Sequence, residues 1–374
     1  VLDKAGYNAW REFYVNDAGN QIEKFGCSLE ARYLQIFKGD EIEFPEDGYQ
    51  GEDIKDLAKE YADLNGDSLV NVSAEERKKS LVDFALPKNI KKMQADMEKY
   101  KIFYDKWFFE SELHKSGAVK AVVDLLTKKG LTYEKEGAVW YKNKEVLTQK
   151  LLKEGKSQKY IDNLELKDDV LIRQNGNPTY FTADIAYHKN KFDRGFTTLI
   201  DVWGADHHGH VMRMKGAMDA IGYDGDKLNV VLMQLVKLVK DGELVKMSKR
   251  TGKAIQLGDL LDEVPVDSAR FLFNTKEANT QMDFDLDLAV SQDNQNPVYY
   301  VQYAHARICS IFKSLAKEGI SPRECTDAEL ALLTAPEEKE LINHLASYTN
   351  EIISAAKDYD PTKVTRYVTQ LATL

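Results

Sequence analysis

Cysteine is scarce in this sequence, with three residues in a chain of 374. Cys27, Cys309 and Cys325 lie far apart, are odd in number and show no Cys-x-x-Cys spacing. This pattern excludes a disulfide-stapled scaffold and a cysteine-rich zinc site. It favours a reducing compartment, and we expect a cytoplasmic protein.

Apolar runs long enough to cross a membrane are missing too. The longest apolar stretch, residues 230–239, includes Gln234 and Lys237 and is far too short for a bilayer. The chain starts at Val1 without a basic-then-apolar leader, and its last residues read as the middle of a helix. We therefore expect a piece of a longer protein with no membrane association. Its length suggests two or three domains, and 43% hydrophobic residues exclude wholesale disorder.

Positive charge is in deficit overall. The net charge of −10 argues against a uniformly basic nucleic-acid binder. Residues 237–253 nevertheless hold six Lys or Arg residues against two acids. A solvated loop is the simplest explanation of such a run. A local patch for phosphates stays open, because affinity for phosphates depends on where the charge sits.

The spacing of apolar residues predicts the order of the elements. Residues 1–35 should form a helix, a turn at 16–20 and a second helix, followed by a loop at 39–51. Residues 52–165 have helical spacing, apart from a hairpin near 133–147. The next segment alternates, with strands expected at 170–172, 198–203 and 229–239 and helices at 184–192 and 208–221. Such alternation predicts an α/β fold with a parallel, doubly wound sheet, which binds ligands at the carboxyl ends of its strands.

A helical module is expected after residue 285. Asn296 and Pro297 are typical of a helix N-cap followed by the first helical position. A stripe of apolar residues follows at helical spacing: Val301, Ala304, Ile308, Ile311 and Leu315. Another helix is expected at residues 337–357.

The string Lys246-Met247-Ser248-Lys249 follows a predicted strand. Lysine ammonium groups in a loop of this kind can stabilise negative charge that develops on a polyphosphate. The simpler alternative is a basic hairpin turn. The ordered string is more specific than lysine content alone, so it favours a functional loop.

A second motif, residues 204–210, lies at the end of a predicted strand. Gly204 would let a ligand approach the backbone, and Asp206 could accept hydrogen bonds from ribose hydroxyls. Three of the seven histidines lie in this segment. His207 and His208 would diverge on a helix, and neither a cysteine nor a His-Glu-x-x-His pattern supports zinc. We expect no protein-bound metal.

Tyr180 and Asp184 are four residues apart, so they would share one face of a helix. A carboxylate beside a phenol suits a cationic ligand through a charge-assisted hydrogen bond. Capping and packing roles remain the commoner explanation of such a pair.

Longer strings make the sequence resemble the class I arginyl-tRNA synthetases. They occur in that family's order and extend over nearly the whole chain. The strings are EFYVNDAGNQI (12–22), WFFESEL (107–113), TYFTADIAYH (179–188), VWGADHHG (202–209), KMSKRTG (246–252), FDLDLA (284–289) and NPVYYVQYAHAR (296–307).

The resemblance implies a ligase. Arginine and ATP, accompanied by Mg²⁺, would give arginyl-adenylate and pyrophosphate, and arginine would then pass to the terminal ribose of arginine tRNA. Activation in this family usually requires bound tRNA. The implied fold is a Rossmann-like parallel sheet with a mostly helical insertion, followed by an α-helical module. We expect a monomer.

The resemblance also implies roles for individual residues. The catalytic residues would be Lys246, Ser248 and Lys249, in a mobile loop that stabilises the departing pyrophosphate. ATP would contact Gly204, Asp206 and Met247. Arginine would contact Tyr180, Asp184 and His207. Asn16, Asp17 and Gln21 belong to a family string but receive no role.

The implied domains are a remnant of the first half of the nucleotide-binding fold (1–35), a connective insertion (36–167), the second half with the Lys-Met-Ser-Lys loop (168–284) and a truncated helical tRNA- and anticodon-binding domain (285–374). The family's His-x-Gly-His signature should precede residue 14, where nothing fits. Residues 207–210 satisfy the bare pattern but lie too close to Lys246. We therefore expect the true signature upstream of Val1, and we expect this piece alone to be inactive.

Three alternatives remain for the function. The first is a non-catalytic RNA-binding relative or a catalytically dead fragment; the intact Lys246–Lys249 string argues against loss of the chemistry, because a pure binding module has no need of it. Another class I synthetase, such as a cysteinyl enzyme, lacks support because no cysteine pair suits a thiol-selecting zinc. A small nucleotidyltransferase built on residues 207–210 fails on spacing.

Overall fold

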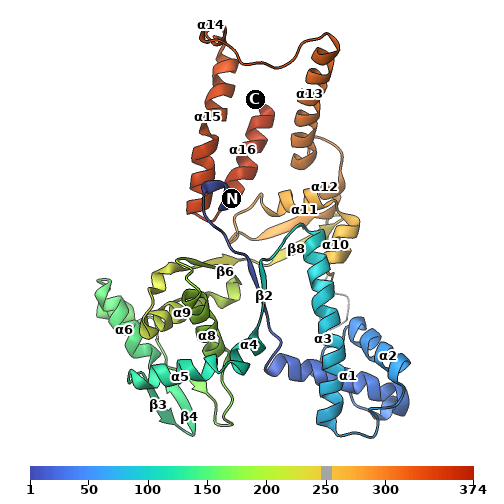
Figure 1. The fold of residues 1–374 in the computed structure, drawn as a ribbon, viewed down its shortest axis with the longest axis vertical. Helices are drawn as coiled ribbons and strands as arrows, with labels where there is room; N and C mark the ends of the chain where they lie inside the picture. The colour runs from blue at the N-terminus through green and yellow to red at the C-terminus, as the bar shows by residue number, and fades with distance from the viewer. Residues whose placement is uncertain (246–254) are drawn as a thin grey trace. The chain divides into compact units, whose positions relative to one another are not determined.

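The computed structural model describes residues 1–245 and 255–374. The chain forms two compact units (Figure 1). Unit 1 consists of Val1–Arg11, Pro87–Phe103 and Gln234–Leu374, and unit 2 consists of Glu12–Leu86 and Tyr104–Met233. Each unit is therefore assembled from segments that are distant in sequence.

Unit 2 holds most of the α/β elements. In chain order these are β1 (Glu12–Val15), α1 (Asn20–Lys38), α2 (Glu52–Asn65), the first part of α3 (Ala74–Lys99), β2 (Lys106–Phe109), α4 (Glu110–Lys115), α5 (Ala118–Lys128), β3 (Thr132–Lys135), β4 (Ala138–Tyr141), α6 (Asn143–Lys153), α7 (Gln158–Asp162), β5 (Asp169–Ile172), α8 (Tyr180–Asp193), β6 (Leu199–Gly204), α9 (His208–Ile221) and β7 (Leu228–Met233). Short 3-10 turns lie at η2 (Gly39–Glu41), η3 (Ala205–His207) and η4 (Gly225–Lys227).

Two parallel strand pairs and their helices form the main core of unit 2. Strand β1 pairs with β2, and β6 pairs with β7 from Leu199 opposite Leu228 to Gly204 opposite Met233. Helices α5, α8 and α9 contribute buried side chains such as Ile185 and Met214 to the same core. Parallel pairs covered by helices confirm the α/β prediction. A second core joins α1, α2 and the start of α3.

The first expected helix is wrong. Residues 12–15 form strand β1, with Phe13 opposite Trp107 in β2. These residues form a strand because they pair with β2, which is distant in the sequence. The spacing of apolar residues within 12–15 does not indicate that pairing. The second expected helix exists as α1, and the expected loop follows it with the short turn η2 at its start. Helices fill most of 52–165 as expected, but residues 106–109 form strand β2, which the spacing did not predict. The hairpin exists as β3 and β4 and ends at Tyr141, because the residues from Asn143 onward belong to helix α6.

Two expected strands differ from the structure. Residues 229–239 are not one strand but two, β7 in unit 2 and β8 (Val236–Lys240) in unit 1. The break falls at Gln234, whose backbone N–H bonds to the carbonyl of Ala278. Strand β5 exists where expected, but it runs antiparallel to β4 and does not join a parallel sheet.

Unit 1 is mainly helical. It contains η1 (Asp3–Ala5), the rest of α3, β8, β9 (Glu243–Leu244), α10 (Leu257–Glu263), α11 (Val266–Phe273), β10 (Met282–Asp285), α12 (Leu286–Val290), α13 (Pro297–Lys317), α14 (Asp327–Leu330), α15 (Pro336–Lys357) and α16 (Thr362–Thr373). Strand β10 runs parallel to β8, and Phe284 lies at the centre of their core. A tight turn at Asp241 and Gly242, both with positive φ, joins β8 to β9.

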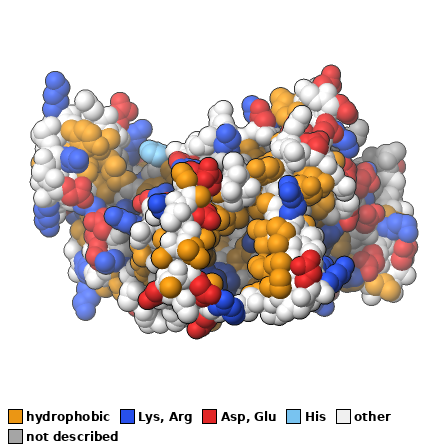
Figure 2. Space-filling model, turned by 90° about the horizontal axis from the view of Figure 1, so that it is seen from above, with side chains coloured by type: hydrophobic (Ala, Val, Ile, Leu, Met, Phe, Trp, Pro, Cys, Tyr) orange, Lys and Arg blue, Asp and Glu red, His pale blue; other side chains and the backbone are white. Residues whose placement is uncertain are grey.

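The start of α13 is as predicted, since the Asn296 side chain accepts a hydrogen bond from the Val298 N–H at 3.0 Å. The apolar stripe along α13 is largely open to solvent, however, with Ile308 52% and Ile311 58% exposed. Figure 2 views the molecule from the end at which Figure 1 draws α13, and apolar side chains lie on the surface there. Helix α15 confirms the helix expected at 337–357. Across the described ranges, no helix is both long enough and apolar enough to cross a membrane.

Candidate functional site

The turn after β6 carries the first group of expected site residues. Gly204 ends the strand with ordinary extended angles (φ −63°, ψ 149°), so its backbone does not require glycine. A Cβ at this position would lie 2.5 Å from Oδ1 of Asp206, but that exposed side chain can move aside, so the surrounding structure does not require glycine either. The side chains of Asp206 and His207 are 82% and 61% exposed and lie 3.7 Å apart. The Asp206 carboxylate is therefore open to hydroxyl donors at the carboxyl end of a parallel strand.

Helix α8 carries the expected cation-binding pair. Its N-cap residue Thr179 donates a hydrogen bond from Oγ1 to the carbonyl of Val170, which fixes the start of the helix to β5. Tyr180 opens the helix and is 42% exposed, and its ring lies beside Gly19, in the turn before α1. Asp184 lies one turn further along, with its side chain 33% exposed. As predicted, both residues are on one helix.

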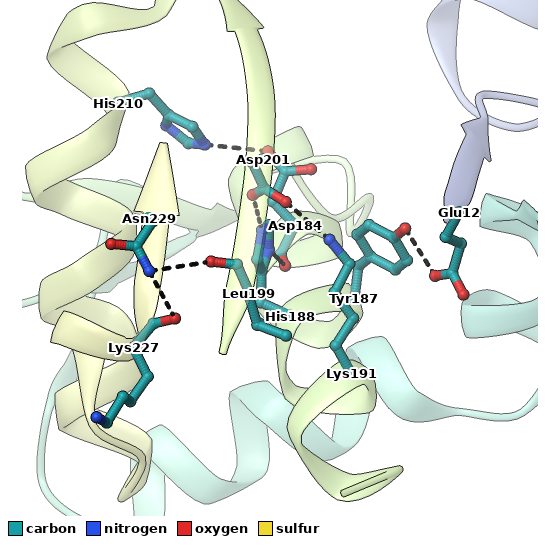
Figure 3. Close-up of polar contacts among 10 residues, drawn as sticks. All are labelled: Glu12, Asp184, Tyr187, His188, Lys191, Leu199, Asp201, His210, Lys227 and Asn229. Carbon is teal, nitrogen blue, oxygen red and sulfur yellow. Dashed lines mark hydrogen bonds and ion pairs between the residues drawn. The ribbon is translucent and has the colours of Figure 1, made fainter. Parts of the chain in front are cut away.

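A histidine joins Asp184 to the turn after β6. Nε2 of His210 lies 3.0 Å from Oδ2 of Asp184 (Figure 3). The His210 ring is held between two aromatic rings, with centroid distances of 5.5 Å to Phe181 and 5.3 Å to Trp203. The polar contact of His207, by contrast, is with its neighbour Asp206.

The carboxyl group of Glu110, at the end of the parallel β1–β2 pair, lies near Asp184. Glu110 follows β2 and is 4% exposed, and this burial raises the pKa of its carboxyl group. The Tyr14 hydroxyl on β1 is buried without a hydrogen-bond partner of ordinary geometry among the described residues. Burial, followed by the negative charges of Glu110 and Asp184, raises the pKa of Tyr14. We call Tyr14, Glu110, Asp184 and His210 the Asp184 cluster.

The strings around residues 16 and 110 hold this cluster in place. With its amide oriented to satisfy its neighbours, Asn16 donates from Nδ2 to Oε2 of Glu110 at 3.1 Å. Oδ1 of Asp17 accepts a hydrogen bond from the backbone N–H of Ser111 at 2.8 Å, which fixes the start of α4. Sequence reasoning gave neither residue a role, and it missed Tyr14 and Glu110 although both lie inside the quoted strings.

A buried ionic group anchors α8 to β6 directly behind Asp184 (Figure 3). Nδ1 of His188 lies 2.7 Å from the backbone oxygen of Asp184, and its Nε2 lies 2.5 Å from Oδ2 of Asp201. Nζ of Lys191 bonds to the other oxygen of Asp201 at 2.8 Å. Burial alone would raise the pKa of Asp201, but His188 and Lys191 lower it far below its usual value. Both ring nitrogens of His188 therefore face oxygen atoms, one on α8 and one on β6.

The expected loop residues Lys246, Met247, Ser248 and Lys249 lie outside the described residues. Within residues 1–245 and 255–374, no group of three or more His, Cys, Asp or Glu side chains is placed to hold a metal ion.

Comparison with known proteins relates this site to one family. Residues 1–309 match the family model of the class I tRNA synthetase (R) catalytic domain, and residues 301–374 match the DALR anticodon binding domain. Arginine--tRNA ligases of Ruminiclostridium cellulolyticum and Caldanaerobacter subterraneus are 54% identical over this whole chain. The chain spans only 63% and 64% of their lengths.

Solved structures agree with these matches. A structure from Campylobacter jejuni, described as an arginyl-tRNA synthetase, has a TM-score of 0.81 at 34% identity, with 100% of this chain and 77% of that chain covered. The Thermus thermophilus arginyl-tRNA synthetase has a TM-score of 0.69 at 19% identity, covers 97% and 66% of the two chains, and supports the fold alone. The chain belongs to the class I arginyl-tRNA synthetase family.

Proposed function

We propose that this protein activates L-arginine with ATP and transfers the arginyl group to the 3′-terminal ribose of arginine tRNA. The observation that carries the proposal is the Asp184 cluster. In a chain of this family, the carboxyl groups of Asp184 and Glu110 and the buried Tyr14 phenol lie near one another, beside the carboxyl end of a parallel strand. Two acids held close together favour a cationic ligand, because the cation offsets their mutual repulsion.

The arginine side chain fits this cluster chemically. Its guanidinium group presents several N–H donors in one plane, whereas a lysine ammonium group is a compact point charge. Oδ1 of Asp184 has no partner among the described residues and is available as an acceptor. The Tyr14 and Tyr180 hydroxyls would add neutral partners, and the buried Glu110 would add a second acidic one.

ATP, with its Mg²⁺, would bind at the turn after β6. Asp206 would accept hydrogen bonds from the ribose, Gly204 would leave room for the nucleotide, and His207 would contact the substrates. In the reaction, an oxygen of the arginine carboxylate bonds to the α-phosphorus, and the bond to the pyrophosphate oxygen breaks. Charge grows on the departing pyrophosphate, where the Lys246, Ser248 and Lys249 side chains would stabilise it. Met247 would contact the adenosine moiety.

The remaining expectations extend the same proposal. The helical region from residue 285 onward would contact the tRNA, in keeping with the anticodon-domain match of residues 301–374. The division at residues 35, 167 and 284 stays a prediction. We propose a monomer in the cytoplasm, which accords with three cysteines that are all free.

Arginine-dependent exchange of pyrophosphate into ATP tests the proposal. It should be measured with and without arginine tRNA, on this chain and on a chain extended to the length of its relatives. We expect exchange only in the extended chain and only with tRNA. A binding protein without catalysis would retain tRNA and give no exchange in either form. Exchange by the 374-residue chain alone would reopen residues 207–210 as the family signature.

A further inference from the structure

The Asp184 carboxylate is held by one of its two oxygens. Oδ2 lies 3.0 Å from Nε2 of His210, and Oδ1 has no partner among the residues that the structure describes. A carboxylate oxygen only accepts, so Nε2 of His210 must carry the proton in this contact. The hydrogen bond therefore fixes which oxygen Asp184 presents to a ligand.

The histidine itself has little freedom. Its side chain is 17% exposed, and its ring lies between Phe181 on α8 and Trp203 on β6. His210 belongs to the first turn of α9, which directly follows the Gly204–His207 turn. The ring thus connects the expected nucleotide end of β6 to the carboxylate expected to bind the amino acid (Figure 3).

We propose that His210 is a positioning residue for arginine specificity. By donating from Nε2 to Oδ2, it holds the Asp184 side chain in the rotamer that points Oδ1 toward the guanidinium group. This inference rests on the proposed function, since it assigns a role within the same site. A purely structural His210 would fill the space between Phe181 and Trp203, and Asp184 would not depend on its hydrogen bond.

Two substitutions separate these roles. His210→Leu keeps an apolar side chain between the two rings and removes the donor. His210→Gln places an amide nitrogen close to the position of Nε2 and keeps the donor. His208→Ala, at an exposed residue of the same turn, is the matched control.

The assay is arginine-dependent pyrophosphate exchange in the extended chain with tRNA. We expect His210→Leu to raise the KM for arginine about tenfold, as losing a partner that orients a binding group usually does. The KM for ATP should change far less, and discrimination against citrulline, the neutral analogue of arginine, should fall. His210→Gln should recover most of the arginine KM, and His208→Ala should match the wild type.

Combination with Asp184→Ala completes the test. If His210 acts through Asp184, adding His210→Leu to Asp184→Ala should raise the arginine KM little further. Equal losses for arginine and ATP, failure of His210→Gln to restore binding, or additive effects would each overturn the inference. If the leucine variant does not fold, ¹⁵N-histidine NMR of the wild type decides. The Nε2 signal of His210 should then move on addition of arginine and stay in place on addition of citrulline.

The two proposals fail in different ways. A wild-type extended chain that neither binds arginine nor catalyses arginine-dependent exchange contradicts the proposed function. A wild-type chain that is arginine-specific, with an unaffected His210→Leu variant, contradicts only the role of His210.

Discussion

Replacing Asp201 by asparagine removes the only negative charge from the buried ionic group behind Asp184. The Asp201 and His188 side chains are 7% and 3% exposed, and the Lys191 side chain is 14% exposed. Breaking a buried ion pair by removing one partner costs about 3–5 kcal/mol. We expect the lower end of this range, because the asparagine side-chain oxygen can still accept a hydrogen bond, and Lys191 can extend toward solvent.

The loss should appear as a lower Tm for the transition of unit 2. At about 2–4 °C per kcal/mol for a domain of this size, a loss of about 3 kcal/mol lowers Tm by roughly 6–12 °C. The matched control is Asp193→Asn at the end of α8, the helix that carries His188 and Lys191. Asp193 pairs with Lys189, its side chain is 48% exposed, and such surface pairs contribute only about 0–1 kcal/mol.

The effect also has a defined pH dependence. The pKa of Asp201 is lower in the folded chain than in the unfolded chain, so its stabilising contribution is present above the unfolded pKa of about 3.9. That contribution is lost as the pH falls toward the folded pKa. The Tm difference between wild type and Asp201→Asn should therefore be constant near neutral pH and shrink below about pH 4. Equal Tm values at pH 7, or a loss no larger than that of Asp193→Asn, would refute this reasoning.

Three further predictions concern the proposed reaction. Asp184→Ala should raise the KM for arginine about 10- to 100-fold and change the KM for ATP little, because a charge-assisted hydrogen bond contributes about 1.5–3 kcal/mol. Equal changes in the two KM values, measured by steady-state exchange kinetics, would contradict its role. Lys249→Ala should slow adenylate formation roughly 100-fold with little effect on arginine affinity, since its contact strengthens in the transition state. Single-turnover kinetics measure the rate and calorimetry measures the affinity, and a pure binding defect would contradict the assignment. Binding of tRNA, measured by filter retention, should weaken roughly a thousandfold between about 50 and 200 mM salt. Binding that does not depend on salt would mean that the basic residues near 237–253 face away from the RNA.

The sequence predicted the helices well and the strand partners poorly. Helical spacing is a local signal, so α9, α13 and α15 could be located from single segments of the chain. Strand β1 depends on β2, which lies beyond the whole α1–α3 region, and no local pattern encodes that pairing. The apolar run at 229–239 predicted one strand but contains two with different partners, since β7 pairs with β6 and β8 pairs with β10.

The candidate site divides in the same way. Tyr180 and Asp184 could be paired because both lie on one helix. Tyr14 and Glu110 could not, because only the missed β1–β2 pairing brings them to Asp184. His210 was visible as one of three clustered histidines, but the choice among them depends on how α9 packs on α8.

The interleaved segments of the two units bear on how the chain folds during synthesis. The first turn, η1, contacts α15 within unit 1, although almost the whole chain separates them (Figure 1). At about 10 residues per second, a ribosome needs roughly half a minute to make the intervening residues. The residues of η1 therefore cannot make their contacts with α15 until that helix has been synthesised. Unit 2 closes on itself at Met233, so it can fold first and leave unit 1 as the slow, late step.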